Sequence, residues 1–330
     1  MVTDQLRPER STSETRSQEM HGPGNRTECV VKRGLPWSLA ALALTGCRSL
    51  ESIPYSPTQT PESWRRIQPF VEVHVGSTTI LVVQPTTTAI VYVLGLVAIG
   101  AGVHFLRRRD GHRSRLWWGI ALPLWGIGAL LAGTSYEAFS YQIKCAGRAA
   151  CLWTSWWEVG YLAVSAASTD AILIAQSHAC ATAGWRRMQI LYAITHCVLY
   201  MIALLTGALV PIPFLISFEF LLIVSAPGIV MLVVQNGRRY ARLKRSLDLA
   251  LLWAWAWLAL TIGAYFLYLI SGVTQRLWAR QIWFSENDVL HIGLILWVVY
   301  LVRVVAPRIE DDVRSAPGGV AGHGAGLMGA

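Results

Sequence analysis

The chain has 330 residues and a formal net charge of +9, with 54% hydrophobic and only 14% charged residues. Soluble domains carry about a quarter charged residues, so this composition excludes an ordinary water-soluble domain. The basic residues lie in short segments between long apolar blocks, where membrane proteins carry their orientation signals, and this placement argues against nucleic acid as a partner.

The N-terminal part has the pattern of an exported bacterial lipoprotein. Residues 1–30 are polar, and we expect them to be disordered or to precede the true start. Residues 31–47 then combine a basic start, a short apolar run and a small-residue end, which is typical of a signal peptide. The run Leu44-Thr45-Gly46-Cys47 resembles a lipobox and predicts lipidation of Cys47. An uncleaved anchor and a chance match are the alternatives.

Residues 48–87 form a predicted extracytoplasmic segment. Phe70 to Val75 alternate with period two, Thr79 to Val83 are rich in β-branched residues, and Gly76-Ser77 lies between the two runs. Such a pattern predicts a small β-hairpin.

Seven apolar blocks follow, each long enough to cross about 30 Å of hydrocarbon as a helix. They cover approximately residues 88–106, 116–139, 156–180, 188–210, 213–234, 247–271 and 288–306. The predicted fold is therefore all-α: a seven-helix integral membrane bundle over 88–306. We expect residues 307–330, rich in Gly and Ala, to be a disordered cytoplasmic tail.

Arginine and lysine set the expected orientation. Fourteen of them lie in alternate loops and after the last block, against four in the opposite loops. The positive-inside rule places the larger group in the cytoplasm, with the C-terminus inside and the processed N-terminus outside. We therefore expect a multi-pass protein of a bacterial inner membrane. The larger group comprises Arg107, Arg108, Arg109, Arg113, Arg115, Arg186, Arg187, Arg238, Arg239, Arg242, Lys244, Arg245, Arg303 and Arg308.

Cysteine and lysine placement add two inferences. Cys145 and Cys151 lie in an outer loop on this topology, where the compartment is oxidising, and their spacing permits a disulfide. Lys32, Lys144 and Lys244 are the only lysines, and none lies within an apolar block, which excludes a retinal Schiff base.

Ionisable residues in membrane spans are functional candidates because their burial is costly. Four lie near the outer ends of the predicted helices: Glu137, Glu158, Asp288 and His291. Asp288 and His291 are three residues apart and share a helix face. Carboxylate and imidazole groups are zinc ligands, and a zinc-bound water attacks esters and amides at neutral pH. The pattern thus predicts a metal-assisted hydrolase that acts on a lipid at the outer leaflet. Asp288 and His291 would bind the metal or activate the water, and Glu137 and Glu158 would complete the catalytic site. Alternatively, the glutamates lie in the wet headgroup layer beside a belt of tryptophans.

Three further polar residues, Asp170, His196 and Glu219, lie deeper in the predicted spans. They can form hydrogen bonds between helices. They can also form a proton or ligand path, in which case the chain is a non-enzymatic module: a sensor, a channel-like bundle or a subunit of an envelope complex.

The segment Asn287-Asp288-Val289-Leu290-His291 resembles the helix-seven motif of the alkaline ceramidases, which share a superfamily of seven-helix membrane hydrolases with the progestin and adipoQ receptors. In that superfamily a Ser and a His on helix two, an Asp on helix three and two His four apart on helix seven hold zinc. The resemblance implies a zinc role for His291, with Asn287 in the position of the other histidine. It implies that Asp170 or Glu158 takes the place of the helix-three acid. Helix two offers Ser135, Glu137 and Ser140 but no His.

Overall fold

The computed structural model describes residues 50–53, 55 and 57–311. The chain divides into two units, Met1–Leu42 and Ala43–Ala330, and every described residue belongs to the second. Cys47 and the signal-like segment lie outside the described residues, as do residues 1–30 and 312–330, so the expectations for them stay predictions.

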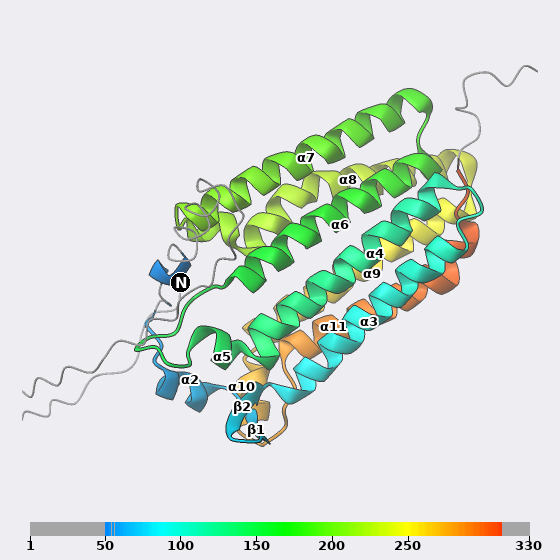
Figure 1. Cartoon of the computed structure of the whole chain (residues 1–330). Helices are drawn as coiled ribbons and strands as arrows, with labels where there is room; N and C mark the ends of the chain where they lie inside the picture. The colour runs from blue at the N-terminus through cyan, green and yellow to red at the C-terminus, as the bar shows by residue number, and fades with distance from the viewer. Residues whose placement is uncertain (1–49, 54, 56, 312–330) are drawn as a thin grey trace, which may run out of the picture. The chain divides into compact units, whose positions relative to one another are not determined.

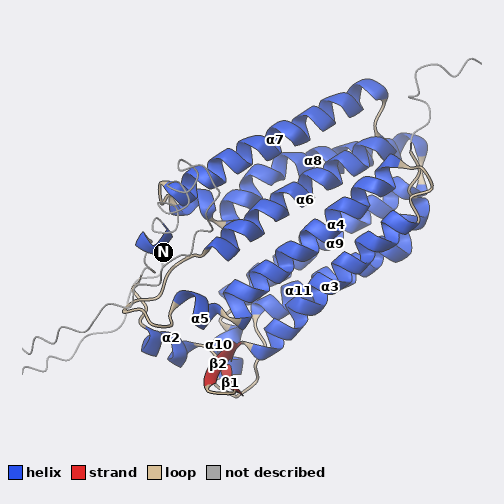
Figure 2. Cartoon of the chain, in the orientation of Figure 1, coloured by secondary structure: helices blue, strands red, loops and turns tan. Residues whose placement is uncertain are grey.

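Seven helices are long and apolar enough to cross a membrane, which confirms the predicted all-α seven-helix bundle and makes the chain a multi-pass membrane protein. Figures 1 and 2 show them running side by side. They are α3 (Pro85–Arg107), α4 (Arg113–Ala132) with its continuation η2 (Gly133–Ala138), α6 (Trp156–Cys180), α7 (Ala183–Leu209), α8 (Phe218–Leu243), α9 (Ser246–Ile270), and α11 (Glu286–Tyr300) with its continuation η4 (Leu301–Val305).

Helix ends follow local chemistry rather than the limits of the apolar blocks. The predicted fifth block began at Pro213, but Pro213–Ile216 form a short 3₁₀ turn, η3, and α8 begins at Phe218. Ser217 ends the turn, and its Oγ accepts a hydrogen bond from the N–H of Phe220 at 3.1 Å, which caps α8. At its other end α8 continues through its arginines to Leu243, because arginine is a good helix former outside the hydrocarbon.

Six helices form a closed ring around an interior, and the seventh packs outside it. Around the ring α3 contacts α4, α4 contacts α6, α6 contacts α8, α8 contacts α9, α9 contacts α11, and α11 returns to α3. Helix α7 packs on α6 at the edge of the bundle (Figure 1). The ring matters for function because a cavity in its interior can have walls from several helices that are far apart in the sequence.

Glycine brings α3 and α4 close together. A Cβ atom on Gly126 would lie 2.6 Å from the carbonyl oxygen of Gly95, which is closer than real Cβ contacts. Small residues at such crossings let helix backbones approach in membranes, where packing rather than hydrophobicity drives association. This close pair makes one side of the ring tight.

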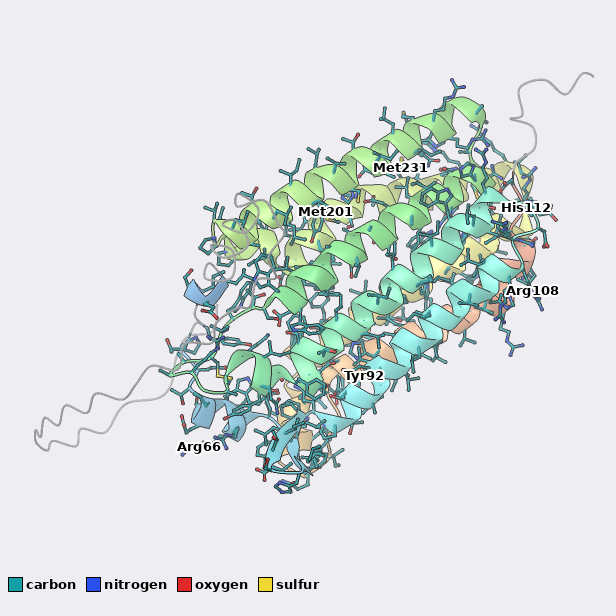
Figure 3. The ribbon with its side chains drawn as sticks, in the orientation of Figure 1. Arg66, Tyr92, Arg108, His112, Met201 and Met231 are labelled. Atoms are coloured by element: carbon teal, nitrogen blue, oxygen red, sulfur yellow. A yellow bond between two sulfur atoms is a disulfide. The ribbon has the colours of Figure 1, made fainter. Side chains whose placement is uncertain are left out.

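The two ends of the bundle differ, and we name them the hairpin end and the arginine end. At the hairpin end, β1 (Phe70–Val75) pairs antiparallel with β2 (Thr78–Val83), with Phe70 opposite Val83. The opposite end carries the α3–α4, α6–α7 and α8–α9 loops. Figure 3 shows Arg66 at the hairpin end and Arg108 and His112 at the arginine end.

A disulfide braces the hairpin end. Cys145 and Cys151 are bonded, as their spacing predicted, and both are buried with Trp64 and Val83. This small core joins the loop after η2 to the hairpin and to α2 (Pro61–Ile67). Three more short helices have these bounds: η1 (Leu50–Ser52), α5 (Ser140–Lys144) and α10 (Val273–Trp278).

At the arginine end, the chain after α11 closes on the start of α4. A short turn, η5 (Ala306–Arg308), is followed by Ile309, which is 1% exposed. The carboxylate of Asp311 accepts hydrogen bonds from the backbone N–H of Arg113 at 2.7 Å and of Ser114 at 3.0 Å. Burial alone would raise the pKa of this carboxyl, but the hydrogen bonds from Ser114 and Arg113 outweigh it, and the pKa is lowered. Residues 307–311 were expected in the disordered tail, but here they cap a helix whose own N-cap, His112, provides no side-chain cap.

Candidate functional site

A polar cavity of about 440 Å³ lies at the hairpin end of the ring. Its walls come from η2, α5, α6, α8, α9 and α11, and residues from α2 and the hairpin region close it from outside. Its polar lining residues are Tyr55, Gln68, Gln84, Tyr136, Glu137, Ser140, Lys144, Glu158, Tyr161, Ser217, Glu219, Tyr265, Asn287 and His291. Cavities of this size hold small-molecule ligands.

Glu137 is buried in the wall of this cavity, and one of its carboxylate oxygens has no hydrogen-bond partner among the described residues. Its side chain is carried by η2, a π-helical turn, and the residue is 3% exposed. Oε1 accepts a long hydrogen bond from Nδ2 of Asn287 at 3.4 Å, whereas Oε2 is buried without a hydrogen bond to any described residue. Single π-helical turns are common at functional sites because they rotate a side chain out of the regular helical register.

His291 lies one helical turn after Asn287 on α11 and lines the same cavity. Its Nδ1 is buried and makes no hydrogen bond within the described part of the chain. Glu137, Asn287 and His291 therefore bring acceptor and donor atoms to one cavity from two helices. Sequence reasoning named Glu137 and His291 for this end of the bundle, and the structure places both on the cavity wall.

Glu158 also lines the cavity, but it is held in an ion pair. Its Oε1 lies 2.5 Å from Nζ of Lys144, and the two side chains are 2% and 3% exposed. The hydroxyl of Ser135 donates to the same oxygen at 2.7 Å, and the Lys144 ammonium lies 4.7 Å from the centre of the Tyr136 ring. Lys144 thus enters the site although the sequence suggested only a loop charge. Its position directly before the disulfide-bonded Cys145, at the end of α5, was the one available signal.

Asp288 occupies a different place from the one its spacing to His291 suggested. Its Oδ2 accepts the backbone N–H of Ser285 at 2.5 Å, and the two residues form a capping box at the start of α11. Asp288 is fully buried and is not among the residues that line the cavity. The pattern Ser285-x-x-Asp288 could have shown this role from sequence, because a Ser followed three residues later by an acid marks a helix start.

The polar cavity offers few side chains that could bind zinc. Within residues 50–311, apart from the two left undescribed, no group of three or more His, Cys, Asp or Glu side chains is arranged to hold a metal ion. Catalytic zinc needs three protein ligands and an open position. Glu137 and His291 supply two candidate donors, Lys144 neutralises Glu158, and Asp288 is used as a cap. The residues present do not fit a zinc site.

The deeper polar residues divide into two places. His196 on α7 contacts Asp170 on α6 through Nδ1, at 2.9 Å and 3.0 Å from the two carboxyl oxygens. Its Nε2 lies 3.1 Å from the carbonyl oxygen of Val224 on α8, and because a carbonyl only accepts, Nε2 carries a hydrogen. These contacts join three helices. Glu219, in contrast, lines the polar cavity at the hairpin end and has no contact with this pair in any described interaction.

A second, apolar cavity of about 230 Å³ continues from the first toward the middle of the ring. Its walls include Val91, Leu94, Trp125, Ile172, Trp255 and Trp297 from five helices. Five residues line both cavities: Ala132, Tyr161, Phe218, Leu290 and His291. The two spaces are therefore neighbours that share a wall, one polar and one apolar.

Comparisons with protein-family models, with curated proteins and with solved structures give no match for this chain.

Proposed function

We propose that this membrane protein binds an amphiphilic, lipid-like molecule, with its headgroup in the polar cavity and its hydrocarbon chain in the apolar cavity. The observation that carries the proposal is the wall shared by the two cavities at Ala132, Tyr161 and His291. A ligand with one polar and one apolar end satisfies both spaces at once, because apolar groups gain free energy on leaving water and polar groups lose it unless they are paired.

The charges of the polar cavity favour a headgroup with hydroxyl or amine donors. Glu137 and Glu219 have no cationic partner among the described ion pairs, and Lys144 is taken by Glu158. Carboxylate oxygens accept hydrogen bonds and repel other anions, so a phosphate headgroup is disfavoured. The unpartnered Oε2 of Glu137 gives such a donor a defined place.

Hydrolysis of the bound lipid is a second candidate function, and one observation favours it. Glu137 and His291 each present a buried polar atom without a partner to the same cavity. Either group can take a proton from a water that attacks an ester or amide carbon, and the acid so formed can return the proton to the leaving alcohol or amine. This route needs no metal ion, which agrees with the weak donor set for zinc.

Localisation belongs to the same proposal. The arginine end is proposed to face the cytoplasm of a bacterial cell, so the hairpin end and its polar cavity open toward the outer leaflet. Lipidation at Cys47 would tether the same side of the chain to the membrane.

Binding is tested with three amphiphiles that share an octyl chain: octyl glucoside, octylamine and octyl phosphate. Each is titrated against the purified protein in phosphatidylcholine nanodiscs. Tryptophan fluorescence is followed, because Trp153 lines the polar cavity and Trp125, Trp255 and Trp297 line the apolar one. The glucoside and the amine should saturate a single site, and the phosphate should bind at least tenfold more weakly. Equal titration curves for all three would overturn the headgroup argument.

Two variants separate binding from partitioning into the nanodisc. Ala132→Phe should abolish the saturable signal, because residue 132 lines both cavities and a phenyl ring there takes up space where the two meet. Leu260→Phe is the matched control, since Leu260 is 72% exposed on α9 and lines neither cavity. The hydrolase is tested separately with an ester or amide substrate. The wild type should release fatty acid or amine, and Glu137→Gln should lose this release while it still binds the substrate.

A further inference from the structure

A separate groove lies at the arginine end, between the start of α7 and the last half of α8. It has a volume of about 830 Å³ and is lined by four arginines and by apolar side chains. We name it the arginine groove, and its lining residues are Cys180, Ala181, Thr182, Ala183, Trp185, Pro227, Val230, Met231, Val234, Gln235, Arg238, Arg239, Arg242, Leu243 and Arg245.

Three of its four arginines are available to a ligand. Arg239 is engaged, because its Nε donates to Asp248 at 3.0 Å and its guanidinium also donates to the carbonyl of Cys180. Asp248 is fully buried in this contact. Arg238, Arg242 and Arg245 form no ion pair with any described residue, although all three line the groove. Three like charges in one place favour an anionic ligand.

The groove also offers a neutral donor and an apolar wall. Oε1 of Gln235 accepts hydrogen bonds from Trp185 at 3.3 Å and from Gln189 at 2.5 Å, which fixes the orientation of the amide. Nε2 of Gln235 is buried and has no partner in the described structure, so it can donate to a ligand oxygen. Val230 and Val234, which are 59% and 43% exposed, continue the groove toward the middle of the bundle.

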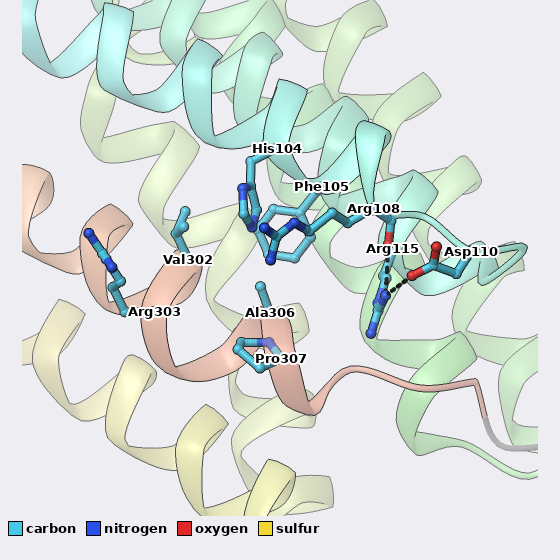
Figure 4. Close-up of a pocket in the computed structure, with 9 residues that line it drawn as sticks. All are labelled: His104, Phe105, Arg108, Asp110, Arg115, Val302, Arg303, Ala306 and Pro307. Atoms are coloured by element: carbon cyan, nitrogen blue, oxygen red, sulfur yellow. Dashed lines mark hydrogen bonds and ion pairs between the residues drawn. The ribbon is translucent and has the colours of Figure 1, made fainter.

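A second basic hollow at the same end lacks these features. It lies between α3 and η4 and is lined by His104, Arg108, Arg115 and Arg303 (Figure 4). Arg115 is already bound to Asp110 at 2.7 Å and to the carbonyl of Arg108. Its apolar lining consists of Phe105, Val302, Ala306 and Pro307, which lie at the same level as the arginines and do not extend along the helices toward the middle of the bundle. Clustered basic residues, which any cytoplasmic end carries as orientation signals, therefore do not by themselves produce a groove with an apolar wall.

We propose that the arginine groove binds a phospholipid with an anionic headgroup, whose phosphate lies among Arg238, Arg242 and Arg245 and whose acyl chain lies against Val230 and Val234. Guanidinium groups match phosphate oxygens in geometry and charge. Basic pockets between transmembrane helices bind anionic headgroups at the membrane surface where positive residues gather. The Gln235 amide donates to an ester or phosphate oxygen of the same lipid. This site is independent of the polar cavity, which lies at the opposite end.

The proposal is tested by native mass spectrometry of the protein released from nanodiscs of equimolar phosphatidylglycerol and phosphatidylcholine. One phosphatidylglycerol should stay bound to each wild-type chain. The groove variant Arg238→Gln/Arg242→Gln/Arg245→Gln should lose it, with about fivefold weaker binding for each arginine removed, since a basic residue near an anionic lipid surface contributes about 1 kcal/mol.

Three controls make the result decisive. Arg107→Gln/Arg108→Gln/Arg303→Gln removes the same charge from the same end and should keep the lipid; equal losses in both triple variants would show only general surface attraction and would overturn the site. Val234→Trp keeps every arginine but fills the apolar wall, and it should also lose the lipid. Displacement of the lipid by millimolar glycerol phosphate would assign the groove to a soluble phosphate and overturn the lipid assignment.

Discussion

The buried ion pair between Lys144 and Glu158 gives the strongest test of the structure at the hairpin end. We consider Lys144→Met, which removes the cation and leaves the Glu158 carboxylate 2% exposed. Breaking a buried pair by removing one partner costs about 3–5 kcal/mol, because the remaining charge is left without compensation. Ser135 still donates to Glu158 at 2.7 Å, so we expect the lower limit, about 3 kcal/mol, or a change on the order of 100-fold in the unfolding equilibrium.

The double variant Lys144→Met/Glu158→Leu should recover most of this loss. With both charges gone, neither position buries an unpaired ion, and the hydroxyls of Ser135 and Ser155 still bond to each other at 2.7 Å. Replacement of a whole buried pair by apolar side chains is often neutral, so the double variant should lie within about 1 kcal/mol of the wild type.

The assay is reversible unfolding by sodium dodecyl sulfate in mixed micelles, followed by helical circular dichroism. Arg148→Ala is the matched control, because Arg148 pairs with Glu51 at 3.0 Å in the same region but the side chains are 35% and 47% exposed. Exposed pairs contribute at most about 1 kcal/mol. The reasoning fails if Lys144→Met costs no more than Arg148→Ala, or if the double variant is as unstable as the single one.

Four other outcomes are expected. Cys145→Ser/Cys151→Ser should lose about 2 kcal/mol in the same unfolding assay, since the bond closes a short loop; an unchanged midpoint under reducing conditions would contradict this. His196→Ala should cost about 1–2 kcal/mol, because Asp170 then keeps, among the described residues, only the thiol of Cys197 as a side-chain partner. Cys197→Ala should cost less, since a thiol is a weak donor; the reverse order would refute the three-helix contact. The pKa of Asp311 is lower in the folded chain than its unfolded value near 3.9, so its contribution to stability is complete above that value and is lost as pH falls through the folded pKa. Asp311→Asn should therefore make the free energy of unfolding less dependent on pH below about pH 4. Equal slopes for the variant and the wild type would exclude the capping role. Alkaline phosphatase fused within residues 107–115 should be inactive and fused within 276–284 active, and the opposite pattern would invert the proposed orientation.

Much of the fold could be predicted from the sequence because its cause is local. Lipid cannot bond to backbone polar groups, so each long apolar block must form its own helix, and counting the blocks gives the bundle. The hairpin and the disulfide were also visible, since alternation over Phe70 to Val75 and the spacing of Cys145 and Cys151 are short-range patterns. Helix ends were less accurate because caps such as Ser217 lie outside the apolar signal.

The candidate site was only partly visible in the sequence. Depth along each span drew attention to Glu137, Glu158 and His291, and the structure places all three on the wall of the polar cavity. Depth could not show that Lys144 neutralises Glu158, nor that Asp288 turns to the start of its own helix. The facing direction of a side chain depends on how each helix is rotated against its neighbours.

The sequence by itself determined seven membrane helices, two chemically different ends and a short list of costly buried ions, because hydrophobicity and charge act on each segment separately. Tertiary structure alone decided which ions meet. It placed α7 outside the ring, paired Glu158 with a lysine, used Asp288 as a cap, and left one oxygen of Glu137 without a described partner in the cavity that His291 also lines. Those outcomes depend on helix rotation and close packing between segments far apart in the chain, and no local pattern records them.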